Sequence, residues 1–262
     1  CHIGRGILTA TNGDVYEGGV VDDMKHGAGR LTCAASGEVY EGAFVDDMKH
    51  GNGRLTYADG SEYCGAFVDD VKNGRGTLVE ANGSTYEGDF LDGLKHGHGK
   101  CTLPDGSVYE GGYVRGEVHG RGRFVADGDE YDGDWEANVQ SGRGRLQYSN
   151  GDVYEGEFKN DMKHGEGVYV GADGSEYAGQ YENDLRHGQG VLTSKNGVEY
   201  IGGFLSGLKH GFGRLMHIVN EDANVYEGYF ESDMRCGQGK YSGTDGCEYE
   251  GSYVDDVKNG RG

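Results

Sequence analysis

The sequence contains almost no proline, no long apolar run and few basic residues. One proline, Pro104, stands beside 53 glycines in 262 residues, a balance that argues against both collagen and a flexible linker. No apolar run approaches the ~20 residues of a membrane-spanning helix. The 24 Lys and Arg residues against 45 Asp and Glu give a net charge of −21. This charge disfavours binding to nucleic acid and direct binding to anionic lipid.

Repetition is what the sequence has in abundance. Eleven tyrosines open similar stretches, and most successive ones are 23 residues apart. Self-similarity at such a period is typical of a repeat array. We therefore expect one continuous array over residues 1–262, in which each tyrosine is position 1 of its repeat. The array comprises a partial repeat at 1–15, full repeats at 16–39, 40–62, 63–85, 86–108, 109–130, 131–153, 154–176, 177–199, 200–225 and 226–248, and a partial repeat at 249–262.

Each repeat carries glycine at positions 3, 12 and 14, and nearly every repeat carries an aromatic residue at position 5. Position 16 is apolar. Spacing by two residues predicts two β-strands, which we expect to form an antiparallel hairpin about a four-residue loop at positions 7–10. Position 5 then faces position 12, position 3 faces position 14 and position 1 faces position 16. In repeat 40–62 the expected pairs are Phe44 with Gly51, Gly42 with Gly53 and Tyr40 with Leu55.

The same register places acidic and basic residues opposite each other. Position 2 is acidic and position 15 is basic in most repeats, so that Glu41 faces Arg54 and such a pair contributes roughly 0.2–1 kcal/mol. Asp-Gly or Asn-Gly, as at Asp59-Gly60, marks a second hairpin turn between repeats. We expect a three-residue loop with a left-handed glycine there, because the odd repeat length otherwise reverses the faces. The predicted fold is all-β, an elongated, twisted, single-layer antiparallel meander of repeated hairpins.

The tyrosines of position 1 and the aromatic residues of position 5 share one face of this sheet. Because no second layer covers that face, we expect a concave, partly exposed strip that binds an extended or helical segment of a partner protein. The alternative is that the rings only cover glycine and one another. The predicted groove residues are Tyr40, Phe44, Tyr63, Phe67, Tyr86, Phe90, Tyr109, Tyr113, Tyr131, Trp135, Tyr154, Phe158, Tyr177 and Tyr181.

Histidine occupies position 11 in seven repeats. Equivalent positions lie two strands, ~9.5 Å, apart, which is too far for a shared zinc ion, so we expect a structural role at the loop edge. His210 and Cys236 are a weak candidate for zinc held between two chains. The acids of positions 7 and 8 are interpreted as a solvated loop edge or, alternatively, as a charged stripe that contacts other chains. No catalytic grouping stands outside the repeat pattern, so we expect no cofactor and no enzymatic activity.

The six cysteines stand at different repeat positions. A ladder of disulfides would recur in phase with the repeat, so we expect reduced thiols in an intracellular protein. The chain begins with Cys1 and ends with Gly262, both inside repeats. We therefore expect it to be part of a longer chain.

The repeated pattern Tyr-Glu-Gly-x-Phe-x-x-x-x-Lys-His-Gly-x-Gly resembles the MORN (membrane occupation and recognition nexus) repeat. The stretch YEGEFKNDMKHGEG at 154–167 is close to a consensus copy, and the resemblance covers essentially the whole chain. It implies an elongated, twisted, single-layer antiparallel sheet with an aromatic groove. It also implies a role like that of chains built from MORN repeats throughout, in ciliary radial spoke heads or in the membrane-associated cytoskeleton of unicellular parasites.

The expected function is a non-enzymatic structural scaffold in the cytoplasm, within a cytoskeletal or axonemal assembly. Exposed strand edges at the ends of a repeat array recruit partners, so we also expect an antiparallel homodimer formed through a terminal repeat. The alternative from another class is a phosphoinositide or membrane-binding module, which the family name suggests.

Overall fold

A computed structural model describes residues 3–219 and 222–260, and these residues form 23 strands and no helix. Successive strands pair in antiparallel fashion as one meandering sheet, as predicted. The chain divides into two compact units, one of Cys1–Asp127 with Glu136–Asn138 and the other of Gly128–Trp135 with Val139–Gly262. The ends of the expected array, residues 1–2 and 261–262, lie outside the described residues, and so does the thiol of Cys1.

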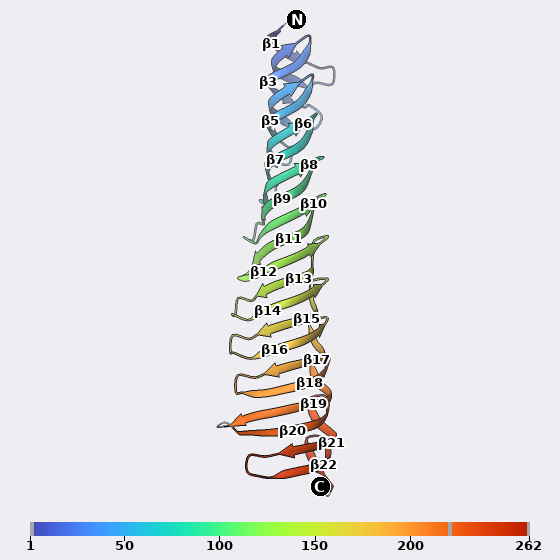
Figure 1. The fold of residues 1–262 in the computed structure, drawn as a ribbon. Coiled ribbons are helices and arrows are strands. Elements are labelled where there is room, and N and C mark those ends of the chain that lie inside the picture. The colour runs from blue at the N-terminus through green and yellow to red at the C-terminus, as the bar shows by residue number, and fades with distance from the viewer. Residues whose placement is uncertain (1–2, 220–221, 261–262) are drawn as a thin grey trace. The chain divides into compact units, whose positions relative to one another are not determined.

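Each unit is a run of β-hairpins, and Figure 1 shows the strands of each following one another in chain order. The first unit holds β1 (Ile3–Thr9), β2 (Val15–Val21), β3 (Met24–Thr32), β4 (Val39–Val45), β5 (Met48–Thr56), β6 (Glu62–Val68), β7 (Val71–Val79), β8 (Thr85–Leu91), β9 (Leu94–Thr102), β10 (Val108–Val114) and β11 (Glu117–Ala126). The strands that follow are β12 (Asp129–Glu136), β13 (Val139–Gln147), β14 (Val153–Lys159), β15 (Met162–Val170), β16 (Glu176–Glu182), β17 (Leu185–Thr193), β18 (Val198–Leu205), β19 (Leu208–Val219), β20 (Asp222–Glu231), β21 (Met234–Ser242), β22 (Glu248–Val254) and β23 (Val257–Asn259).

The predicted hairpin register is correct at positions 1 to 3. Tyr40 faces Leu55 and Gly42 faces Gly53 between β4 and β5. The expected pairing of position 5 with position 12 is wrong, because Phe44 faces Lys49 instead. The loop is only two residues long, and both of them, Asp46 and Asp47, have positive φ, as in a type I′ turn.

Because the loop is two residues shorter than predicted, β5 has two residues more than β4 between the neighbouring pairs, and they form a bulge. Three residues, 50–52, lie opposite the single residue Ala43, between the pairs on either side of it. Gly51 lies in this bulge with φ 67°, a conformation that favours glycine. In the neighbouring hairpin Gly51 faces Phe67. Position 12 therefore faces the aromatic residue of the following repeat rather than that of its own.

Most connections between repeats have the three-residue geometry that the sequence predicts, whereas Asp127-Gly128 forms a two-residue turn and the connection at 33–38 is longer. Tyr57 donates its N–H to Ser61 O (2.9 Å), and Gly60 donates to Tyr57 O (3.1 Å). Gly60 has φ 89°, so three residues form a type I turn closed by a left-handed glycine. Eight connections share this pattern, at 10–14, 57–61, 80–84, 103–107, 148–152, 171–175, 194–198 and 243–247. Repeat 200–225 is three residues longer than most. Its extra residues lengthen β19 and β20, which pair as far as Val219 and Asp222.

The core of each unit is a single file of aromatic rings. Phe44 contacts Tyr40 of its own repeat and Tyr16 of the preceding one, edge to face, with ring centroids 5.1 Å apart in both cases. The second unit has the same arrangement, in which Phe158 touches both Tyr131 and Tyr154. The sheet thus buries apolar surface against itself, one repeat on the next.

Candidate partner-binding surface

The position 1 tyrosine lies flat over the two glycines of its hairpin. A Cβ atom added at Gly42 would lie 2.5 Å from the Tyr40 hydroxyl, and one at Gly53 would lie 2.4 Å from the ring. The hydroxyl donates a hydrogen bond to Ala43 O at 3.0 Å. Burial, followed by the nearby carboxylate of Asp70, raises the pKa of Tyr40 to about 12.

The predicted groove is wrong in one respect, because its rings are buried rather than partly exposed. Thirteen of the fourteen residues are at most 6% exposed, and Tyr63 and Tyr154 are fully covered. Trp135 is the exception, with intermediate exposure. Whether a partner binds along these residues stays a prediction. Buried rings can offer it little direct contact.

The rings are covered without a second layer of secondary structure. Each position 1 tyrosine has glycine beneath it and neighbouring rings at its edges. The long side chain of position 10 also reaches over the strip, since Lys72 Nζ lies 5.5 Å from the centroid of Tyr63 and 5.6 Å from that of Phe90. Aliphatic stems exclude water from apolar surface while their charged ends stay accessible. The alternative that the rings cover glycine and one another thus describes their packing.

The acid at position 8 clamps its turn to the preceding repeat. Asp70 donates its N–H to Lys49 O at 3.0 Å, and its Oδ1 accepts the N–H of Lys49 at 2.9 Å. Asp or Asn makes the same side-chain bond at Asp47, Asn138, Asp161, Asp184, Asp233 and Asp256. Position 8 is therefore part of the backbone hydrogen-bond network rather than a purely solvated edge.

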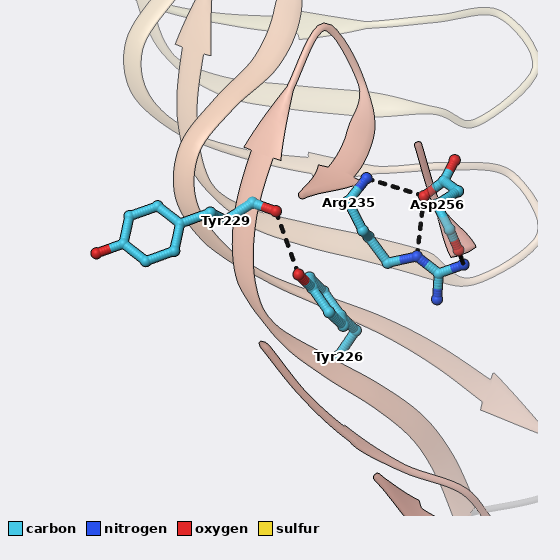
Figure 2. Close-up of polar contacts among 4 residues, drawn as sticks. All are labelled: Tyr226, Tyr229, Arg235 and Asp256. Carbon is cyan, nitrogen blue, oxygen red and sulfur yellow. Dashed lines mark hydrogen bonds and ion pairs between the residues drawn. The ribbon is translucent and has the colours of Figure 1, made fainter. Parts of the chain in front are cut away.

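Figure 2 shows this clamp at the end of the second unit, where Arg235 meets Asp256. The guanidinium adds two bonds, from Nε to Oδ1 at 2.9 Å and from an Nη atom to Asp256 O at 3.0 Å. Burial acts to raise the pKa of Asp256, but the hydrogen bonds from Arg235 hold it below its ordinary value. The carboxylate is thereby kept charged where it closes the turn.

The histidines of position 11 lie beside the acid of position 7 in the next repeat. His50 Nδ1 is 3.5 Å from Asp69 Oδ1, and His26 Nδ1 is 3.6 Å from Asp46 Oδ1. Among the described residues no group of three or more His, Cys, Asp or Glu side chains could hold a metal ion. The structural role of these histidines at the loop edge stays a prediction.

The candidate zinc site between two chains, at His210 and Cys236, is not tested by a single chain. Burial and the neighbouring Glu231 raise the pKa of the Cys236 thiol, which disfavours the thiolate that zinc binds. The described cysteines, Cys33, Cys64, Cys101, Cys236 and Cys247, are all free.

The outward-facing charges pair differently from the prediction. Glu41 faces Arg54 across the hairpin as expected. However, its carboxylate contacts Arg30 Nε of the preceding repeat at 2.9 Å, while Arg54 contacts Glu62 at 3.5 Å. Most of these side chains are more than half exposed, so each pair contributes at most about 1 kcal/mol.

Among the exposed apolar residues that lie outside the predicted groove, two groups are considered further. One is a cross-strand pair on β19 and β20, Phe212 and Tyr229, which are 60% and 51% exposed with their rings 5.6 Å apart. Figure 2 shows the Tyr229 ring pointing away from Tyr226. Positions 13 and 4 carry small or polar residues in the other repeats, so this break in the pattern was visible in the sequence. The other feature is a row of aliphatic residues at the hairpin turns of the first unit.

This is a repeat protein built from one β-hairpin unit, which carries a pair of glycines and adds its aromatic rings to a single file. The chain belongs to the MORN-repeat family. The family model matches residues 16–37, 40–62, 63–85, 86–108, 109–130, 131–153, 154–176, 177–199, 200–216, 226–248 and 249–262. This match confirms the resemblance found in the sequence.

Comparison with other known proteins adds little to this assignment. No curated protein matches the chain significantly. Among solved structures, the TCP10c domain of Drosophila melanogaster Sas-4 is 11% identical with a TM-score of 0.34, and the match covers 68% of this chain and 99% of that one. The TCP domain of Drosophila SAS-4 in complex with a proline-rich motif of Ana2 is 12% identical with a TM-score of 0.28, over 75% of this chain and 88% of that one. Scores this low support no inference about this chain.

Proposed function

We propose that this chain is a non-enzymatic scaffold, an array of protein-interaction surfaces within a cytoskeletal or axonemal assembly such as a radial spoke or the membrane-associated cytoskeleton. MORN repeats are generally structural or interaction modules, and eleven of them match here. No helix among the described residues is long and apolar enough to cross a membrane. The proposed location is the cytoplasm.

One observation carries this proposal. The file of aromatic rings forms the core between each hairpin and the next. The outer face and the turns of each unit are therefore not needed for the core and stay accessible. The same kinds of side chain recur on these surfaces from one hairpin to the next. Repeated, accessible surfaces suit the binding of several chains or of one long segment.

The surface hollows of the second unit do not favour an enzyme. A hollow of about 320 Å³ is lined by His164, Glu166, Glu182 and His187 among others. His187 Nδ1 lies 3.3 Å from a carboxylate oxygen of Glu182, and both histidines stand at the recurrent position 11. This hollow supplies charged groups but no nucleophile and base that break the symmetry of the array.

The proposed partners are proteins, in helical or extended segments, together with a second copy of this chain. We propose that the array is continuous over 1–262 and that it forms an antiparallel homodimer through a terminal repeat. Trp135 is the predicted groove residue best suited to contact a partner, because it alone keeps intermediate exposure. The other rings would support partner binding indirectly, by holding the outer face and the turns of their hairpins in place.

Two fractionation measurements on the full chain test the proposal. In cell extracts, the scaffold should remain with the detergent-insoluble cytoskeleton. In flotation assays, it should not rise with phosphoinositide-containing vesicles at physiological ionic strength, because its net charge is −21. Salt-sensitive flotation with loss from the cytoskeletal fraction would instead identify a membrane-binding module.

A further inference from the structure

A row of aliphatic residues, most of them exposed, runs along the hairpin turns of the first unit. The residues before and after each two-residue turn pair across the hairpin, as Val68 does with Val71 and Leu91 does with Leu94. These four side chains are between 41% and 49% exposed. We call this set the tip row, and its members are Val21, Met24, Val45, Met48, Val68, Val71, Leu91, Leu94 and Val114.

The fold does not require apolar residues in the tip row. In the second unit the residue before the turn is Lys159, Glu182 or Glu231 in three hairpins, and their register is the same. A charged residue is thus compatible with this place in the hairpin. Exposed aliphatic pairs also stand at some turns of the second unit, as at Leu205 and Leu208, but charged residues interrupt them. The uninterrupted row of the first unit therefore indicates a function beyond folding, since exposed apolar patches mark interaction sites.

Four of the five turns beside the tip row are strongly acidic, whereas the turn after Val114 is Arg115-Gly116. The first four turn pairs contain seven Asp residues, Asp22, Asp23, Asp46, Asp47, Asp69, Asp70 and Asp92. Asp47 and Asp70 accept backbone hydrogen bonds. The side chains of Asp46 and Asp69 are 61% and 64% exposed. An apolar row flanked by acids is complementary to a segment with apolar residues between Lys or Arg.

Backbone bonds fix the spacing of the tips. Asp70 donates to Lys49 O at 3.0 Å and Gly93 donates to Lys72 O at 2.9 Å, so each turn is held to the hairpin before it. Neighbouring tips are two strands apart, or about 9.6 Å. A polyproline II helix has three residues per turn and rises about 9.3 Å in that turn. Side chains three residues apart in such a segment would meet successive tips on one side.

An α-helix fits the spacing less well. Seven residues of α-helix rise about 10.5 Å, nearly 1 Å more than the distance between tips, and the mismatch accumulates along the row. A β-strand matches the distance with three residues but turns alternate side chains to opposite faces. Polyproline II is the conformation that matches both distance and direction.

We propose that the tip row binds a polyproline II segment of a partner protein, with an apolar residue at every third place and Lys or Arg between. This inference rests on the scaffold function proposed above and names the kind of partner. The apolar residues would cover the aliphatic pairs, and the cations would lie beside the turn acids. Such a contact weakens as salt rises, because its charged part is exposed.

The test uses the full chain and a fluorescein-labelled peptide of about five Val-Arg-Pro triplets, one for each tip of the row. Anisotropy should show saturable binding. The double variant Val68→Lys with Leu91→Lys should weaken it at least about tenfold, and Lys159 shows that the fold accepts lysine there. The control Val79→Lys changes a residue of the same unit that is 39% exposed but lies at the other end of its strand, beside the connection between repeats, and the variant should bind like the parent chain.

Two further peptides separate spacing from charge. A peptide of the same composition in which the valines are irregularly spaced should bind several-fold more weakly, and one with Glu in place of Arg should not bind. Equal affinity for the irregular peptide, or equal binding by the double variant, would overturn the proposal, as would absence of binding. If the parent chain fractionates with the cytoskeleton but does not bind the Val-Arg-Pro peptide, the tip row is refuted and the scaffold function stands.

Discussion

The ring of Tyr40 lies so close to Gly53 that no side chain would fit at Gly53. A Cβ atom there would lie 2.4 Å from the tyrosine ring, well inside van der Waals contact. The ring in turn lies against Gly42 on the paired strand. This relationship explains why glycine recurs inside strands, where it otherwise costs conformational entropy.

Gly53→Ala should lower the unfolding free energy by about 1–3 kcal/mol, because the added methyl displaces a buried ring. Denaturant unfolding of the two chains gives the difference. Gly4→Ala is the matched control, since a Cβ atom on Gly4 meets nothing within 4 Å, and its effect should stay within about 0.5 kcal/mol. Equal effects of the two substitutions would show that ring packing is not what requires glycine.

Tyr40→Phe should cost about 1 kcal/mol, because Ala43 O loses the hydroxyl that donates to it. Tyr253→Phe should be neutral or stabilising. The Tyr253 hydroxyl is buried without a hydrogen-bond partner among the described residues. Unfolding curves of the two variants, compared with that of the parent chain, separate the hydrogen bond from ring packing. A loss at Tyr253 as large as that at Tyr40 would contradict this account.

Three substitutions at Asp70 separate the turn conformation from the side-chain clamp. Asp70→Asn should be nearly neutral, as Asn138 makes the same bond to Val118 N–H. Asp70→Gly keeps the left-handed turn, with φ 69° in the parent, but loses the bond and should cost about 1 kcal/mol. Asp70→Ala should cost about 1 kcal/mol more than Asp70→Gly, because alanine disfavours that backbone conformation. Any other order in thermal unfolding would refute the clamp.

Much of the hairpin was predictable because it depends on residue periodicity. The pairs at Tyr40 and Gly42 follow from spacing by two residues, and the connections between repeats follow from Asp-Gly and Asn-Gly. The short loop at Asp46-Asp47 was missed, because two consecutive non-glycine residues with positive φ are uncommon. The burial of the rings was missed for a different reason. Periodicity shows which face a side chain takes but not that it lies down over glycine.

The candidate site was less predictable than the fold. The invariant aromatic residues pointed to a groove, but invariance within the array reflects the needs of packing, and Phe67 is only 1% exposed. The tip row was overlooked because its residues vary between Val, Leu and Met. Its signal is a comparison within the chain, between Val68 or Leu91 and their charged counterparts Lys159 and Glu182.

Phe67→Ala should therefore act on stability, with a loss of about 3–5 kcal/mol. The ring touches both Tyr40 and Tyr63 at 5.1 Å, so two repeats lose contacts together. Val68→Ala, one residue further and 43% exposed, should change stability by less than about 1 kcal/mol. Chemical denaturation of both variants gives the comparison. A folded Phe67→Ala chain of parental stability would mean that the ring is available to partners after all.

Tyrosine titration distinguishes a closed aromatic core from an open groove. Burial raises the pKa of Tyr63, Tyr86 and Tyr200 to about 12, above the ordinary value of about 10. A raised pKa of this kind stabilises the folded chain below pH 10, and the contribution is lost as the pH rises from 10 towards 12. Absorbance at 295 nm and circular dichroism should be followed together on the full chain. The account predicts that most tyrosines ionise only above pH 10, together with loss of the sheet, whereas ionisation of the repeat tyrosines near pH 10 with an intact sheet would contradict it.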